Sequence, residues 1–185
     1  MNYLRYAFAW GVAPDTPAGA TAFSYHRSLQ PVLWALLSAS LLETAVLHLL
    51  LARLWSVRGS LLLLIVSILG LIWLIGLINS LVRLPLLVTD DGVRLRSGLL
   101  LDRWLPLDQI AAVNLVTDPG DLKRSDLLKA SLLAYPNTLV QLVRPLPVRG
   151  RGGQSRTITT VALRPDDAAG FAAAVTEAKR RVLDA

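Results

Sequence analysis

Two ionisable side chains, Glu43 and His48, interrupt a long apolar stretch of the chain. A charged group inside a bilayer costs a few kcal/mol or more, so such residues usually face a partner or a water-filled cavity. Ser40, Thr44 and His48 recur at every fourth position, which places them on one face of a helix. Glu43 lies beside that polar face. We expect Glu43 to be protonated, to pair with His48, or to contact a group of another chain.

The polar face has two plausible roles. In the simpler one, Glu43 and His48 stabilise helix packing within the protein or within a homo-oligomer. In the other, they take part in a proton or ion pathway or dock a partner membrane protein. In an antiparallel hairpin, Glu43 would lie level with Ser67 to Gly70, where small side chains let helices approach closely.

Basic residues concentrate in the second half of the chain. Residues 123–164 contain eight lysines and arginines against one acidic residue, Asp126. A basic surface beside a bilayer favours anionic lipid headgroups. Tyr135 is the one aromatic residue in this stretch, so the stacking platform of a single-strand nucleic-acid binder is missing. A solvated hairpin tip explains the glycine-rich loop equally well. The predicted lipid or partner contacts are Arg144, Arg149, Arg151 and Arg156.

No motif in the sequence predicts enzymatic chemistry. The chain has no cysteine and two histidines, which excludes disulfides, thiolate catalysis and a histidine-rich metal site. The paired carboxylates at 90–91 and 166–167 occupy turn and helix-cap positions, and no serine lies in a Gly-x-Ser-x-Gly motif. We therefore expect a protein that is not an enzyme and that binds no cofactor, metal or nucleic acid.

The polar face is carried by two apolar stretches, residues 31–54 and 60–82. Each contains the roughly 20 largely apolar residues that a helix needs to cross a hydrocarbon core. Pro31 suits the first turn of a helix because it has no N–H to leave unpaired. The turn at 56–59 is so short that the two helices must be antiparallel neighbours. The sequence predicts a transmembrane hairpin over residues 31–83.

Lysines and arginines near the helix ends indicate the orientation of this hairpin. Four arginines flank it on the side shared by both termini, and two, Arg53 and Arg58, lie in the turn. The positive-inside rule therefore predicts a multi-pass protein of the cell inner (plasma) membrane with both termini in the cytoplasm.

Residues 1–30 form a mixed segment that we interpret as a cytoplasmic or interfacial leader. Phe23, Tyr25 and Trp34 are expected at the membrane interface, with His26 and Arg27 among the headgroups. A cleavable signal peptide is less favoured, because a proline and an aspartate interrupt the short apolar run.

Residues 84–185 change to short alternating runs separated by turn residues. The runs at 86–89 and 93–96 flank Asp90-Asp91-Gly92, a hairpin signal in which the glycine would supply a positive φ. Further strands are predicted at 100–105, 111–116, 138–144 and 157–163. Residues 122–133 are compatible with a helical turn or with the start of a strand.

The chain ends with a predicted amphipathic helix over residues 168–183. Phe171, Val175, Ala178 and Val182 fall on one face of it. Acidic residues before this helix and basic residues in its last turns complement the helix dipole. The soluble part is therefore expected to contain about seven strands followed by one helix.

Three segments of this part carry a resemblance to a known family: Val88-Thr-Asp-Asp-Gly-Val-Arg-Leu-Arg-Ser-Gly98, Trp104-Leu-Pro-Leu-Asp-Gln-Ile-Ala-Ala-Val113 and Val161-Ala-Leu-Arg-Pro-Asp-Asp-Ala-Ala-Gly-Phe171. Together with the preceding hairpin, they resemble bacterial pleckstrin-homology-like membrane proteins. The resemblance implies a partly open antiparallel barrel or sandwich of two packed sheets, capped by the C-terminal helix. Its motifs are structural and bring no catalytic residues. The first hairpin has only Arg94 and Arg96 where a phosphoinositide pocket would need a denser basic cluster.

Together these patterns predict a membrane α+β protein with three parts: a leader (1–30), a transmembrane hairpin (31–83) and a pleckstrin-like domain (84–185). The expected function is non-enzymatic: the domain is presented in the cytoplasm for association with a protein, a lipid surface or further copies of the chain. The alternative is an accessory subunit of a membrane transport or proton-coupled complex that uses Glu43 and His48. The expected partners are membrane lipids, together with a homo-oligomer or another membrane protein.

Overall fold

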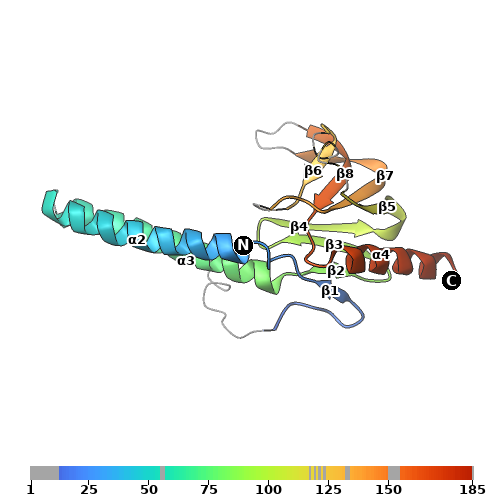
Figure 1. The fold of residues 1–185 in the computed structure, drawn as a ribbon, viewed down its shortest axis with the longest axis horizontal. Coiled ribbons are helices and arrows are strands. Elements are labelled where there is room, and N and C mark those ends of the chain that lie inside the picture. Colours follow the sequence, from blue (N-terminus) through green and yellow to red (C-terminus); the bar gives the residue numbers. More distant parts are fainter. Residues whose placement is uncertain are drawn as a thin grey trace.

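The computed structural model describes residues 13–54, 57–116, 118, 120, 122, 124–131, 134–149 and 155–184. A long helical hairpin projects from a β domain, and a last helix packs on that domain (Figure 1). The helices are α2 (Gln30–Leu54), α3 (Val57–Arg83) and α4 (Ala168–Leu183), with the short 3₁₀ helix η1 (Leu107–Gln109). The strands are β1 (Thr21–Phe23), β2 (Leu86–Val88), β3 (Gly92–Ser97), β4 (Leu101–Pro106), β5 (Ile110–Leu115), β6 (Leu127–Lys129), β7 (Thr138–Arg149) and β8 (Ser155–Leu163).

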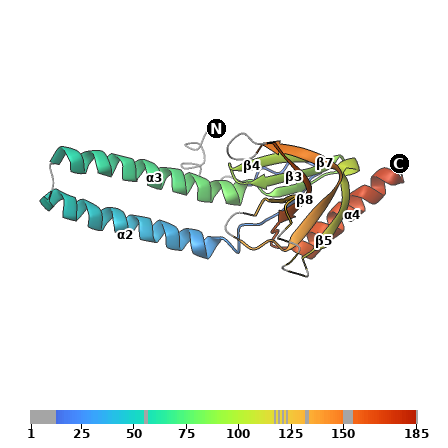
Figure 2. The same cartoon turned by 90° about the horizontal axis from the view of Figure 1, so that it is seen from above.

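Helices α2 and α3 run antiparallel and side by side away from the domain (Figures 1 and 2). Both are long and apolar enough to cross a membrane by length and composition. Only 11% of the most apolar window of α2 and 22% of that of α3 are buried. The core helix of a soluble protein would instead bury its apolar side chains. The hairpin therefore exposes an apolar surface of the kind that lipid covers.

Two four-stranded sheets form the β domain. One sheet has the order β1-β2-β3-β4 and the other the order β5-β7-β8-β6. β6 runs parallel to β8, whereas the other pairs are antiparallel. The predicted strands are confirmed at all six positions, and the segment left open at 122–133 contributes β6.

The predicted C-terminal helix is confirmed as α4 (Ala168–Leu183), which packs against β5, β2 and η1. Its residues Phe171, Val175 and Ala178 are fully buried. Val182 was expected on the same face but is half-exposed; Figure 1 shows the C-terminal end of α4 extending past the sheets. Asp167 caps the helix by accepting a hydrogen bond from the Gly170 amide.

The N-terminal segment packs into the β domain. Tyr25, which was expected at the membrane interface, belongs to the hydrophobic core, and Phe23 packs against that core. β1 pairs with β2, with Thr21 opposite Val88. The Phe23 ring meets the Phe171 ring edge-on at a centroid distance of 5.5 Å, and Tyr25 is 7% exposed. Trp34, in contrast, is exposed on α2.

The β2–β3 hairpin forms as predicted, but the role of its glycine is different. Among the described glycines, positive φ occurs at Gly19 and Gly98 and not at Gly92. A Cβ at Gly92 would come within 2.6 Å of the Leu105 carbonyl oxygen and of the Trp104 ring. Glycine is required here because β4 and the Trp104 side chain approach closely, which turn statistics do not predict.

One hydrophobic core joins the hairpin to the β domain. It contains Leu33 and Leu37 from α2, and Leu74, Ile78 and Leu81 from α3. The same cluster contains apolar side chains of both sheets and of α4: Leu86, Val93, Leu95, Val140, Val161, Phe171 and Val175. The hairpin base is thus part of the domain interior rather than a linker.

Candidate functional site

A groove between α2 and α3 brings the intramembrane polar residues together. It has a volume of about 480 Å³, and its apolar walls come from both helices. Its lining is Leu36, Ser40, Glu43, Thr44, Leu47, Leu63, Ser67, Gly70, Leu71, Trp73 and Leu74. Glu43 therefore shares the groove with Ser67 and Gly70, the level on α3 that an antiparallel hairpin predicts. Since the lining extends over about three turns of each helix, the groove is elongated along the hairpin axis.

Glu43 is the ionisable residue of this groove. Its side chain is exposed, and no hydrogen bond or ion pair holds its carboxyl group among the residues that the structure describes. Arg53 follows Glu43 by ten residues, or about 15 Å along a helix. If Arg53 lies at headgroup level, Glu43 lies near the middle of a hydrocarbon core that is about 30 Å thick.

His48 has a partner of its own and does not pair with Glu43. Its Nδ1 atom lies 3.2 Å from the Oγ atom of Ser60 on α3. Ser60 is buried, so this hydrogen bond fixes the distal part of the hairpin. Thr44 also acts locally, since its hydroxyl donates to the Ser40 carbonyl oxygen at 2.8 Å. The expected polar face therefore divides into a helix-packing contact at His48 and an open site at Glu43.

The structure also places the side chains of two of the four predicted basic contacts, Arg144 and Arg156. Arg156 donates from its guanidinium to the carbonyl oxygens of Ser125 and Leu127, at 2.9 Å for Leu127, and so ties β8 to the start of β6. Arg144 is exposed on β7. The side chain of Arg149 and the whole of Arg151 lie outside the described residues. Of the four predicted contacts, the described part of the structure leaves Arg144 exposed and engages Arg156 in the fold.

The two arginines of the first hairpin are also paired within the protein. Arg94 makes two hydrogen bonds to the Asp102 carboxylate, at 2.7 and 2.8 Å, and these lower the pKa of Asp102. Arg96 is buried and contacts the Asp15 carboxylate at 2.9 Å. Neither guanidinium is presented as a free phosphate ligand.

Searches of protein-family models, curated proteins and solved structures found no match to this chain. The resemblance to pleckstrin-like membrane proteins stays a prediction.

The junction of the hairpin with the β domain contains polar contacts that the sequence patterns did not indicate. The Tyr25 hydroxyl donates to the Leu84 carbonyl oxygen at 3.0 Å and accepts from the Gly98 amide at 2.6 Å. Burial raises the pKa of Tyr25 well above its usual value, so the hydroxyl stays protonated. Ser80 on α3 accepts from the Leu99 amide at 3.2 Å. The end of α3 is thus tied to the β3–β4 turn and to the segment before α2.

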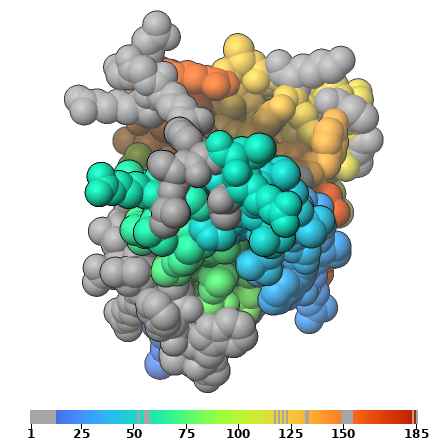
Figure 3. Space-filling view, turned by 90° about the vertical axis from the view of Figure 1, so that its left-hand side faces the viewer, coloured from blue at the N-terminus to red at the C-terminus, as the bar shows by residue number. Residues whose placement is uncertain are grey.

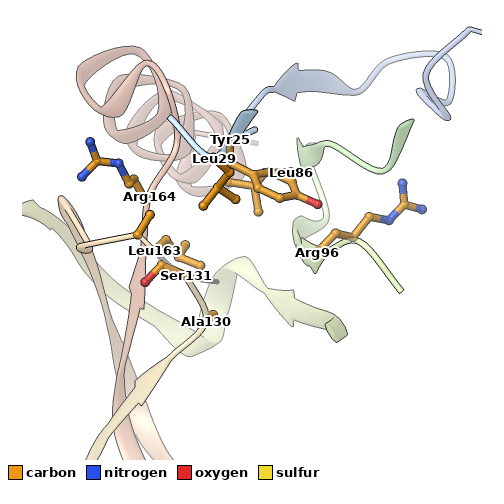
Figure 4. A pocket seen from close by; sticks show the side chains of 9 residues that line it. Tyr25, Leu29, Leu86, Arg96, Ala130, Ser131, Leu163 and Arg164 are labelled. Atoms are coloured by element: carbon orange, nitrogen blue, oxygen red, sulfur yellow. The ribbon is translucent and has the colours of Figure 1, made fainter. Parts of the chain in front are cut away.

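A small cavity lies beside this junction, lined in part by Tyr25, Leu29, Leu86 and Arg96 (Figure 4). The figure shows the Arg96 guanidinium directed away from the other lining residues. The cavity volume is about 10 Å³, which suits a single water molecule and no larger ligand. We assign it a packing role.

The paired carboxylates occupy structural positions. Asp90 forms an ion pair with Arg181 of α4 at 3.0 Å. Asp166 accepts a hydrogen bond from the Arg27 amide at 3.3 Å, and Asp167 caps α4. The described residues contain no cluster of three or more metal-ligating side chains.

Proposed function

We propose that this protein is a non-enzymatic membrane adaptor. Its hairpin anchors it in the inner membrane, and its β domain is held in one fixed pose at the cytoplasmic surface, where it binds a protein partner. The observation that carries this proposal is the shared core: Leu33 and Leu37 of α2, and Leu74, Ile78 and Leu81 of α3, pack in one cluster with both sheets.

The hairpin position supports a fixed pose. Viewed from the hairpin tip, the two helices project from one end of the molecule, with residues of β6, β7 and β8 on one side and the segment before α2 on the other (Figure 3). If the helices cross the bilayer, this end of the domain lies against the headgroups. A flexible tether would leave the domain free to rotate, whereas a shared close-packed core does not.

The charges of the described surface favour a protein partner over a lipid surface. Arg94 and Arg96 are paired with carboxylates, and Arg156 binds backbone carbonyl oxygens. Each basic residue adds about 1 kcal/mol of lipid attraction only if it lies free near the membrane surface. Among the predicted contacts that the structure places, Arg144 and Arg156 are both exposed, but backbone carbonyl oxygens hold the Arg156 guanidinium.

The proposed topology is tested by labelling introduced cysteines, since the chain has none of its own. Leu61→Cys near the hairpin tip and Thr176→Cys on α4 change two exposed residues. In sealed inverted vesicles, a membrane-impermeant maleimide should modify position 176 and leave position 61 unmodified until detergent is added. Reaction at position 61 alone, or equal reaction at both positions, would contradict the proposal.

The second candidate function is an accessory subunit of a membrane transport or proton-coupled complex. The observation in its favour is the open groove with Glu43 at the middle of the hairpin. His48 supports this role less, because Ser60 already binds it. Under this second function, Glu43→Gln would impair the activity or the assembly of the complex and leave the β domain folded.

A further inference from the structure

We infer that the groove between α2 and α3 binds a transmembrane helix of a different polypeptide, and that this helix places a lysine or arginine against Glu43. The inference rests on the proposed membrane function and names the chemistry of one partner. Three observations carry it: the shape of the groove, the isolated carboxyl group, and the distribution of charge in the hairpin.

The shape of the groove suits a helix. Its lining extends from Leu36 to Leu47 on α2 and from Leu63 to Leu74 on α3, a length of about 17 Å along each helix. Gly70 lies in the lining, and a Cβ added there would have nothing within 4 Å. Small residues at this level let a third helix approach closely, as is typical of helix interfaces in membranes.

The carboxyl group of Glu43 lacks a partner among the described residues of the hairpin. Carboxyl groups at this depth pair with other polar groups or face water, because hydrocarbon offers them no hydrogen bond. The groove lining contains no lysine, arginine or histidine, so it supplies no counter-charge. A cationic side chain from a third helix would complement both the charge and the apolar walls.

A second copy of the chain does not supply this cation. Between residues 33 and 52, and between 59 and 82, the sequence contains no lysine or arginine. A copy inserted in the same orientation would place its own Glu43 at the same depth. Its His48 lies about 7 Å farther along α2 and is bound to Ser60. The charge pattern therefore favours a different polypeptide over self-association.

The test uses designed transmembrane peptides and the full-length protein in phosphatidylcholine vesicles. One peptide is a leucine helix of about 21 residues with a single central lysine, and its control has leucine at that position. Energy transfer between labelled protein and labelled peptide measures the association. We expect the lysine peptide to bind wild-type protein about tenfold more tightly than the leucine peptide, the range of polar contacts between membrane helices.

Two protein variants locate the contact. Glu43→Gln should abolish the preference for the lysine peptide, and Gly70→Leu should weaken binding by filling the groove. The matched control Leu69→Ile changes an exposed neighbour of Gly70 and should leave binding unchanged. The inference is overturned if wild-type protein binds both peptides equally, if Glu43→Gln keeps the preference, or if copies of the protein associate through Glu43 instead. Flotation of the protein with the vesicles would show that the membrane anchor holds in each of these cases.

Discussion

Tyr25 is the residue at which the N-terminal segment, the end of α3 and the β3–β4 turn meet. Its hydroxyl has two backbone partners, Leu84 and Gly98. Removing the hydroxyl in Tyr25→Phe leaves a buried amide and a carbonyl without partners, which should lower the free energy of unfolding by about 1–3 kcal/mol. Thermal unfolding in detergent measures this change. The exposed Tyr135→Phe serves as the control; an equal effect in both variants would disprove the role of Tyr25.

Gly98 provides a second test at the same junction. Its φ is +51°, and a Cβ would lie 2.5 Å from the Ser80 Oγ atom. Gly98→Ala should therefore combine backbone strain of about 1–2 kcal/mol with displacement of Ser80 from the Leu99 amide. At Gly19 the φ is +79°, but nothing lies within 4 Å, so Gly19→Ala isolates the strain. Chemical denaturation should show the larger loss for Gly98→Ala.

His26 makes the junction sensitive to pH. Burial lowers the pKa of His26 below the usual 6.5; the Asp166 carboxylate offsets part of this shift, and the Arg27 guanidinium adds to it. The unfolded chain therefore binds a proton more readily than the folded protein, and stability should fall as the pH decreases below about 6.5. In His26→Gln, the part of this decrease that comes from His26 should vanish. Melting temperatures measured between pH 5 and 8 would contradict this expectation if wild type and variant showed the same slope.

At the scale of elements, the strap formed by residues 13–30 fastens the hairpin to the domain. The Asp15 amide donates to the Arg83 carbonyl oxygen at the end of α3, and its carboxylate pairs with the buried Arg96. Asp15→Asn removes the carboxylate nearest to Arg96 and leaves that of Asp102, whose Oδ1 atom lies 3.9 Å from the Arg96 Nε atom. An uncompensated buried charge costs about 3–5 kcal/mol. We expect a smaller loss here, because Asp15 is itself exposed and Asp102 stays near Arg96, and the domain should become easier to digest. Limited proteolysis, with exposed Asp108→Asn as control, checks this.

The strap also contains a strand and contacts that the sequence did not predict. The long helices and the strands from β2 to β8 are visible as local periodicity, and they were predicted except for the short β6. β1 has three residues and no such periodicity. It is a strand because residues more than 60 positions away offer it a free sheet edge. The roles of Tyr25 and Gly98 were not predicted for the same reason: their partners are distant in sequence.

The candidate site also contains features that the sequence predicts and features that it does not. The level of Glu43 relative to Gly70 follows from helix geometry alone, so the sequence predicts it. The partner of His48 does not follow from helix geometry, because the rotation of α3 about its own axis decides whether Ser60 faces α2. For Arg156, charge alone suggested a lipid or partner contact, but the carbonyl oxygens that bind its guanidinium come near it only once the strands are paired.

At the scale of the whole molecule, the central claim is that the hairpin and the β domain move as one body. The absence of native cysteines allows spin labels to be placed at two chosen sites. Labels at Leu61→Cys and Thr176→Cys would report the distance between the hairpin tip and α4 by pulsed electron paramagnetic resonance in vesicles. The shared core predicts one narrow distance distribution in wild-type protein. A broad or multiple distribution in this otherwise wild-type background would contradict the claim that the domain is held in a fixed pose at the membrane.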